Sequence, residues 1–288
     1  MCRKQIMDKK SVKKNKNFYP AALSVSGSDS GGGSGIQADL RTFNAFGVYG
    51  TTAITAVAAQ NHRQIRNVVP IFPAALAAQI AAVMDGYAVK CCKSGTLASA
   101  ENAVVLAEAV KKYQLTLVYS SAKHPCDDEA FIAALDSKLL PLAAWMTLEL
   151  PEAGALLDRQ VSAEDMPECA LKLYEKYGAS IILHGGCTAA AGGLKRCSDI
   201  ICRQNRLYRL STLAADLPAG TAHGAGSTFS AALCALLAVN APWKEAVCAA
   251  KAFVMGALME NVNVGNGVYA MYPPEMNYMD NVNLEELN

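Results

Sequence analysis

Short apolar runs rich in β-branched residues alternate with longer helical stretches along most of this chain. The candidate strands are residues 21–26, 52–58, 88–92, 115–120, 144–147 and 181–184. The helix-like segments between them are residues 36–46, 74–84, 101–113, 128–140 and 164–177. Strands that alternate with helices of this length are typical of βαβ units, whose parallel strands share a sheet covered by helices on both faces. The pattern therefore predicts a three-layer α/β/α protein with a mostly parallel central sheet.

The last third of the chain departs from this alternation. Residues 199–202 and 207–212 have the composition of a hairpin at the edge of the sheet. Two helices, 227–239 and 243–262, then follow, and residues 269–288 look like a polar, flexible end. Because no linker rich in proline, glycine or charge divides the chain, we expect residues 18–288 to form a single domain.

The charge of the chain is unevenly distributed. Its formal net charge is +1, but residues 1–17 hold seven of the 26 basic residues and one of the 25 acidic residues, which leaves 19 basic against 24 acidic groups in the rest. A body with a net charge of −5 argues against a nucleic-acid groove. The basic segment 1–17 lacks the apolar region of a secretory signal, so we interpret it as a disordered tail. No run is long enough to span a membrane, and we expect a cytoplasmic protein.

The ten cysteines do not form a metal-binding pattern. No Cys-x-x-Cys occurs, and Cys187, Cys197 and Cys202 fall at irregular spacings without a paired histidine. This spacing argues against a zinc site. The expectation is therefore free thiols in a reducing cytoplasm.

A first glycine-rich turn, residues 27–35, lies between the first strand and its helix. It contains neither the Gly-Lys-Ser/Thr of a Walker A loop nor Gly-x-Gly-x-x-Gly, although a flexible Gly/Ser loop is the simpler alternative. Ligands of such sheets bind at the carboxyl ends of the strands. We interpret the turn as a loop shaped around a small molecule, with Asp39 as a polar anchor one turn into the helix.

A second glycine-rich turn, residues 223–228, opens the apolar helix that follows. The first N–H groups of a helix are unpaired and bind anions, and Gly224 and Gly226 allow these amides to point inward. Alternatively, Ser227 is only the helix N-cap. Two glycines before a Ser-Thr start favour a phosphate site.

Residues 22–61 closely resemble the N-terminal signature of the hydroxymethylpyrimidine kinases, a group of the ribokinase superfamily. The match includes Gly-Ser-Asp-Ser-Gly-Gly-Gly, Gly-Ile-Gln-Ala-Asp-Leu and a Gln-Asn end. Residues 93–97 resemble the family's Lys-Ile-Gly-Met-Leu, 150–153 its Leu-Pro-Glu-Ala, 185–186 part of its Lys-Gly-Gly-His, and 223–228 its His-Gly-Thr-Gly-Cys-Thr. The resemblance covers roughly residues 20–270 and implies a ribokinase-like fold.

The resemblance also implies a reaction, in which the γ-phosphoryl group of ATP is transferred to a hydroxymethyl pyrimidine and then to its monophosphate. Position by position, the resemblance implies that the backbone at Gly27, with Asp39 and Gln60, holds the pyrimidine. It also implies that Ala58 and Thr96 line the pyrimidine pocket. Phosphoryl transfer needs mainly positioning and charge neutralisation.

For the phosphate side, the resemblance makes Glu152 the glutamate of a Mg²⁺ site. The backbone at Gly224, Gly226 and Ser227 is expected to form an anion hole. Many members of the superfamily form dimers, which implies a homodimer here.

The departures from the family pattern concentrate at the catalytic positions. Ser227 replaces a cysteine, so proton removal would fall to water or phosphate, and His184 replaces a phosphate-binding lysine and would be mostly neutral at its ordinary pKa. Ser120 falls in a strand ending that has lost an aspartate, which Glu149 could partly replace as a metal ligand, and Thr96 replaces a methionine.

Three functions remain open at this point. The first is ATP-dependent phosphorylation of hydroxymethylpyrimidine or its phosphate in thiamine biosynthesis, and the second is a pyridoxal-type vitamin B6 kinase. The third is a catalytically weak pseudokinase that binds pyrimidine or nucleotide as a sensor, because several lost groups together would slow the transfer by orders of magnitude.

Overall fold

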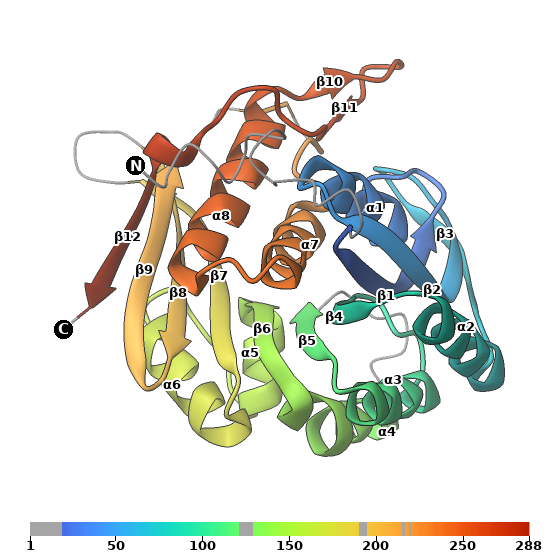
Figure 1. Cartoon of the computed structure of the whole chain (residues 1–288). Helices are drawn as coiled ribbons and strands as arrows, with labels where there is room; N and C mark the ends of the chain where they lie inside the picture. Colours follow the sequence, from blue (N-terminus) through green and yellow to red (C-terminus); the bar gives the residue numbers. More distant parts are fainter. Residues whose placement is uncertain (1–18, 121–128, 190–194, 215–216, 219, 288) are drawn as a thin grey trace.

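A ten-stranded sheet runs through the centre of the molecule in the computed structural model, which describes residues 19–120, 129–189, 195–214, 217–218 and 220–287 (Figure 1). The strand order is β12-β9-β8-β7-β6-β5-β4-β1-β2-β3. The strands are β1 (Ala21–Asp29), β2 (Tyr49–Gln60), β3 (Ile65–Pro70), β4 (Val89–Ser94), β5 (Thr116–Ser120), β6 (Ala143–Glu149), β7 (Ser180–Ala189), β8 (Lys195–Arg203), β9 (Arg206–Leu213) and β12 (Val282–Leu287). A small separate pair consists of β10 (Val262–Asn263) and β11 (Tyr269–Ala270).

The six central strands β1, β2 and β4 to β7 pair in parallel, whereas β3, β8, β9 and β12 each join in antiparallel pairs. Parallel neighbours require crossover connections, and helices supply them. The predicted α/β/α architecture with a mostly parallel sheet is therefore confirmed.

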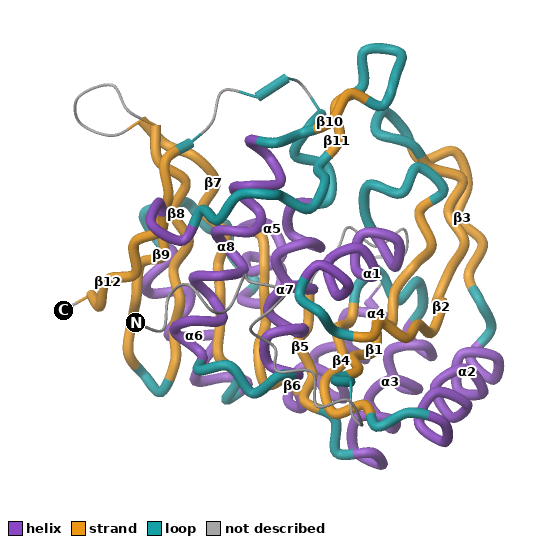
Figure 2. Tube along the Cα trace, turned by 45° about the horizontal axis from the view of Figure 1, so that its top comes forward, coloured by secondary structure: helices purple, strands orange, loops and turns teal. Residues whose placement is uncertain are grey.

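Helices cover both faces of the sheet (Figures 1 and 2). On one side α1 (Gly35–Ala45), α7 (Ala225–Ala238) and α8 (Trp243–Met259) pack together. The other side carries α2 (Pro73–Gly86), α3 (Ala100–Tyr113), α4 (Glu129–Ala134), α5 (Leu150–Leu157) and α6 (Met166–Tyr177). Short turns of π-helix (Leu135–Leu139) and 3₁₀-helix (Leu140–Leu142, Met279–Asn281) complete the described helices.

Successive residues of each buried strand alternate between two hydrophobic cores. On β1, Ala22 packs with Phe43, Phe229 and the other core residues under α1, α7 and α8. Its neighbour Leu23 packs into the core beneath α2, α3 and α6. This alternation follows from the two-residue period of a strand and explains why the central strands are continuous apolar runs.

Three elements within the first 160 residues were not expected from the sequence. Strand β3 is an exposed edge strand, α5 is a short helix with proline in its first turn, and residues 135–142 leave the α-helical path. The prediction of a flexible end at residues 269–288 was wrong for residues 269–270, because β11 pairs with β10, and for residues 282–287, because β12 pairs with β9. The prediction that the β8–β9 hairpin lies at the edge of the sheet is therefore wrong, because β12 lies beyond β9 and forms that edge. The hairpin's turn residues Gln204 and Asn205 both have positive φ, as a two-residue hairpin turn requires.

The expectation of free thiols was also wrong at one place. Cys187 on β7 and Cys197 on β8 form a disulfide across this antiparallel pair. Among the described residues, no helix is long and apolar enough to cross a membrane. The predicted tail 1–17 lies outside the described residues.

Candidate active site

A cavity of about 550 Å³ opens where the carboxyl ends of β1, β2, β4 and β5 meet the starts of α5 and α7. Parallel strands end at the same side of a sheet, so their final residues converge there. Nine of the residues singled out in the sequence line it: Gly27, Ala58, Gln60, Thr96, Glu149, Glu152, Gly224, Gly226 and Ser227. Ser120, at the end of β5, lies in the same wall.

The two glycine-rich turns, far apart in the sequence, pack against each other. Gly224 has a φ of +85°, and a side chain there would run into the carbonyl oxygen of Gly33. Gly35, with a φ of +60°, likewise lies against the carbonyl oxygen of Gly27. Both positions require glycine, because an L-residue would be strained and would push the loops apart. The two loops therefore form one rigid corner of the cavity.

Asp29 ties this corner together from beneath. Its carboxylate accepts hydrogen bonds from the N–H groups of Gly31 and Ser34, at 2.8 and 2.9 Å, and from the Ser34 hydroxyl at 2.9 Å. Nε2 of His223 lies 3.3 Å from Asp29 Oδ2 and 3.3 Å from Gln60 Nε2. Burial alone would raise the pKa of Asp29, but the hydrogen bonds from His223, Ser34 and Gly31 outweigh it and lower the pKa to about 2.

The start of α7 faces the same cavity. Gly224 occupies the N-cap position, so the alternative in which Ser227 is the N-cap is wrong. The N–H of Ala225 donates to the Ala222 carbonyl at 3.1 Å, and the N-cap glycine has no side chain to accept from the next amides. The N–H groups of Gly226 and Ser227 can therefore serve an anion at the positive end of this 14-residue helix. A Cβ on Gly226 would lie 3.6 Å from Glu149 Oε1, which places α5 and α7 on opposite sides of one narrow gap.

At the cavity floor, Ser227 contacts a buried ion pair, of which Lys93 lines the cavity and Asp39 does not. Lys93 Nζ donates to both oxygens of Asp39, at 2.8 and 2.9 Å, and to Ser227 Oγ at 2.7 Å. Ser227 Oγ lies 3.1 Å from Asp39 Oδ1, and Ser24 Oγ donates to Asp39 Oδ2 at 2.6 Å. Asp39 is 0% exposed and Lys93 1%. Asp39, the expected anchor for a ligand, does not line the cavity but lies under it.

Two carboxylates stand at the start of α5. Glu149 is the N-cap residue and Glu152 lies in the first turn, where its Oε2 accepts from the backbone N–H of Glu149 at 2.8 Å. Both side chains line the cavity. The described residues contain no cluster of three or more His, Cys, Asp or Glu side chains for a metal. Two carboxylates on a cavity wall fit Mg²⁺, which keeps several waters and binds one or two carboxylates together with substrate phosphates.

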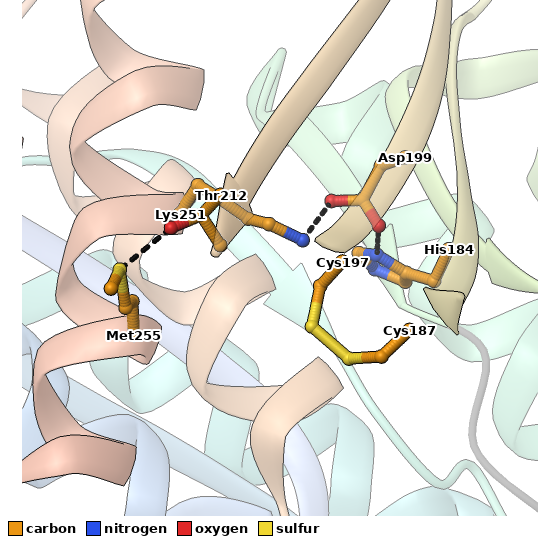
Figure 3. Close-up of a disulfide and its surroundings, with 7 residues drawn as sticks. All are labelled: His184, Cys187, Cys197, Asp199, Thr212, Lys251 and Met255. Atoms are coloured by element: carbon orange, nitrogen blue, oxygen red, sulfur yellow. Dashed lines mark hydrogen bonds and ion pairs between the residues drawn. A yellow bond between two sulfur atoms is a disulfide. The ribbon is translucent and has the colours of Figure 1, made fainter. Parts of the chain in front are cut away.

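His184 is not among the residues that line the cavity. It lies in the middle of β7, where its Nδ1 is 3.3 Å from Asp199 Oδ1, and Lys251 Nζ contacts Asp199 Oδ2 at 2.7 Å (Figure 3). Burial lowers the pKa of His184, but the attraction of Asp199 outweighs burial, so the pKa lies above its ordinary value. From the sequence, His184 was expected to lie at the phosphates with its ordinary pKa. Both expectations are wrong, because His184 does not line the cavity and its pKa is raised.

The disulfide lies beside this group, on the two strands that carry His184 and Asp199 (Figure 3). His184 and Asp199 are register partners, and the next pair in the ladder is Cys187–Cys197, beyond an irregularity in the register. Lys251, His184 and Asp199 thus join α8 to the β7–β8 pair.

Lys93, Asp29 and His223 also line the cavity, although none of them was among the predicted site residues. Each belongs to a segment that the sequence marked, since Lys93 opens the run 93–97 and the other two lie within the glycine-rich turns. A lysine within a continuous apolar strand is rarely fully buried without a partner, and that was the available signal for Lys93.

Comparison with known proteins gives consistent results. A sequence model of the family described as phosphomethylpyrimidine kinase matches residues 29–272. A hydroxymethylpyrimidine/phosphomethylpyrimidine kinase of Haemophilus influenzae is 36% identical over 85% of this chain and 93% of its own length. A pyridoxine kinase of Bacillus subtilis is also 36% identical, over 83% of this chain and 90% of its own.

A solved structure extends the likeness to the fold. Pyridoxal kinase from Staphylococcus aureus, in complex with AMP-PCP and pyridoxal, superposes with a TM-score of 0.80 at 27% identity, covering 94% of this chain and 100% of that one. That protein holds an ATP analogue and a vitamin together. The relatives thus divide between pyrimidine and B6 kinases at equal identity, and this chain belongs to the phosphomethylpyrimidine kinase family of ribokinase-like vitamin kinases.

Proposed function

We propose that the chain transfers the γ-phosphoryl group of ATP to hydroxymethylpyrimidine, to its monophosphate, or to both in turn, as in thiamine biosynthesis. The observation that carries the proposal is the single cavity shared by the glycine turn at Gly27, the α7 start at Gly224 and the carboxylates of α5. An acceptor on one side and a phosphate chain on the other would meet above Ser227.

On the acceptor side, the ring would lie against Ala58 and Thr96. Gln60 offers an amide that can both donate to and accept from the ring nitrogens and amino group of a pyrimidine. The backbone at Gly27 offers further polar groups without a side chain in the way. Asp39 acts from below the floor in this proposal and does not contact the ring.

On the phosphate side, the amides at Gly224, Gly226 and Ser227 would bind phosphoryl oxygens and stabilise the charge that the transfer redistributes. Glu149 and Glu152 would hold Mg²⁺. When bound, this ion would neutralise phosphate oxygens and fix their position. His184 has no part in the proposal, because it lies outside the cavity.

The test is ADP formation by the purified protein with MgATP and each pyrimidine in turn. We expect turnover with at least one pyrimidine. In Glu152→Gln, the Mg²⁺ concentration for half-maximal rate should rise, while thermal stability should stay close to that of the wild type. As a matched control, Glu164→Gln removes the same charge from an exposed residue away from the cavity. Binding of pyrimidine without any turnover would contradict the proposal and favour the sensor.

A vitamin B6 kinase is the second candidate function, and one position favours it. Thr96 replaces the bulkier methionine of the pyrimidine kinases at the cavity wall, which leaves room and a hydroxyl for a different ring. Thr96→Met should then lower the rate with pyridoxal more than the rate with pyrimidine. Equal effects on both acceptors would remove this argument.

The chain is also proposed to act in the cytoplasm as a homodimer, as its resemblance to other ribokinase-like proteins implies. Light scattering of the eluting protein tests the dimer, and a mass of one chain of 30.4 kDa would contradict it.

A further inference from the structure

The Lys93–Asp39 ion pair lies within hydrogen-bonding distance of the hydroxyl of Ser227, which lines the cavity at the start of α7. Lys93 and Asp39 come from β4 and α1 and are buried, and Ser227 is partly exposed. Lys93 and Ser227 line the cavity, whereas Asp39 lies under it. A buried ion pair contributes little to stability compared with apolar residues of the same volume. Its contact with the Ser227 hydroxyl at the cavity therefore points to a role in the reaction.

The hydrogen bonds fix the orientation of the Ser227 hydroxyl. A serine hydroxyl has one proton to donate and two lone pairs. A lysine ammonium can only donate, so Lys93 Nζ, at 2.7 Å, occupies one lone pair. An ionised carboxylate can only accept, so the hydroxyl proton points to Asp39 Oδ1, at 3.1 Å. One lone pair of Ser227 Oγ remains, and Ser227 lines the cavity.

We propose that Ser227 and Asp39 form a proton relay for the phosphoryl transfer, with Asp39 as the final base; this inference rests on the proposed kinase function. The acceptor hydroxyl donates to the free lone pair of Ser227. As its oxygen bonds to the γ-phosphorus, the bond from that phosphorus to the β–γ bridging oxygen breaks and ADP leaves. The acceptor proton passes to Ser227 Oγ while the Ser227 proton passes to Asp39.

The surrounding groups suit this step. Lys93 keeps its proton throughout, so the pair changes from net neutral to net positive as Asp39 takes up the proton. That positive charge develops directly below the oxygen that becomes a phosphate ester. Lys93 and Ser24, which donates to Asp39 Oδ2 at 2.6 Å, are positioning residues that hold the carboxylate in line.

The relay removes the need for a thiol. A serine hydroxyl on its own is a poor base, and that is the deficit the replacement of cysteine creates. A serine that only passes a proton on does not need to ionise. The same buried pair thus explains how this chain can retain catalysis with serine at position 227.

The first test is the rate of the chemical step in single-turnover rapid-quench experiments. Ser227→Ala leaves the ion pair intact, and we expect a ~10²- to 10⁴-fold loss of this rate, the range for loss of general base catalysis. The acceptor affinity measured by calorimetry should change little. Ser227→Thr keeps a hydroxyl and should restore most of the rate.

The second test addresses Asp39. Because Asp39→Asn alone would leave a buried lysine without its partner, the pair is neutralised together in Asp39→Asn/Lys93→Gln. We expect a loss of similar size to that of Ser227→Ala, and no further loss when the two are combined, because both cut the same route.

A readout that requires no Asp39 variant is the proton inventory of the wild-type chemical step in H₂O–D₂O mixtures. Two protons in motion give a curved dependence, which Ser227→Ala should abolish. Three results in an active enzyme would overturn the relay but not the proposed function: a linear dependence of the rate on the D₂O fraction, additive rate losses in the combined variant, or an unchanged rate in Ser227→Ala. A wild type that phosphorylates no acceptor would overturn the proposed function and the relay together.

Discussion

Replacing Asp29 by asparagine should destabilise the folded protein because four hydrogen bonds converge on its carboxylate. The pKa of Asp29 is lowered from 3.8 to about 2, and its side chain is 3% exposed. A difference of about 1.8 pKa units corresponds to roughly 2.5 kcal/mol at 1.36 kcal/mol per unit. Asparagine keeps one acceptor but turns an N–H₂ group toward other donors, so we expect Asp29→Asn to lose about this amount at neutral pH.

The pH dependence distinguishes the charge of Asp29 from its shape. Since the folded-state pKa is below the unfolded value, the stabilisation is fully present above about pH 5 and is lost as the pH falls from 3.8 toward 2. Urea unfolding of wild type and variant at pH 7, 5, 4 and 3 measures the difference. The gap between the two should be constant from pH 7 to 5 and shrink at pH 3. An equal gap at every pH, or a gap no larger than that of the exposed control Glu164→Gln, would refute the reasoning.

Three further predictions follow from the same geometry. Gly224→Ala should cost ~1–2 kcal/mol for the left-handed backbone alone, and its collision with the neighbouring loop should weaken ATP binding, as calorimetry with the nucleotide would reveal. The imidazole of His184 should titrate above pH 6.5 by NMR in the wild type and at a lower pH in Asp199→Asn, because the attraction that raises its pKa is removed. An unchanged pKa in that variant would contradict the interaction between His184 and Asp199. Alkylation of the denatured wild type should label two fewer cysteines before reduction than after it, and Cys187→Ser should abolish this difference. If the wild type is labelled equally with and without reduction, Cys187 and Cys197 are both thiols.

The sequence predicted the centre of the sheet well because strands buried on both faces are continuous apolar runs. It did not predict β3, whose edge position leaves Ile65 and Val69 more than half exposed, so no core-facing pattern marks the strand. Strand β12 did carry a signal. Val282 and Leu284 alternate with polar residues and pack onto the core under α8, and a search for a two-residue period at the end of the chain would have found them.

At the cavity, residues that lie at strand ends and in glycine turns were predictable, because their place in a parallel sheet fixes their side of the molecule. The direction of individual side chains was not. Asp39 and Lys93 are 54 positions apart, and only the packing of α1 onto the sheet shows that they form an ion pair at the cavity floor. His184 is the register partner of Glu149 at the end of β6, but its imidazole contacts Asp199 on the adjacent strand, and His184 does not line the cavity.

The most direct test of the central claim is a competition between acceptors for limiting MgATP. Equal concentrations of hydroxymethylpyrimidine, its monophosphate and pyridoxal are mixed with the purified protein, and the phosphorylated products are resolved by mass spectrometry. Because the acceptors compete in one tube, the product ratio reports the ratio of their kcat/KM values. We predict that phosphorylated pyrimidines predominate and that their formation requires Mg²⁺. Predominance of pyridoxal phosphate, or no phosphoryl transfer to any acceptor, would contradict the assignment of this chain as a pyrimidine kinase.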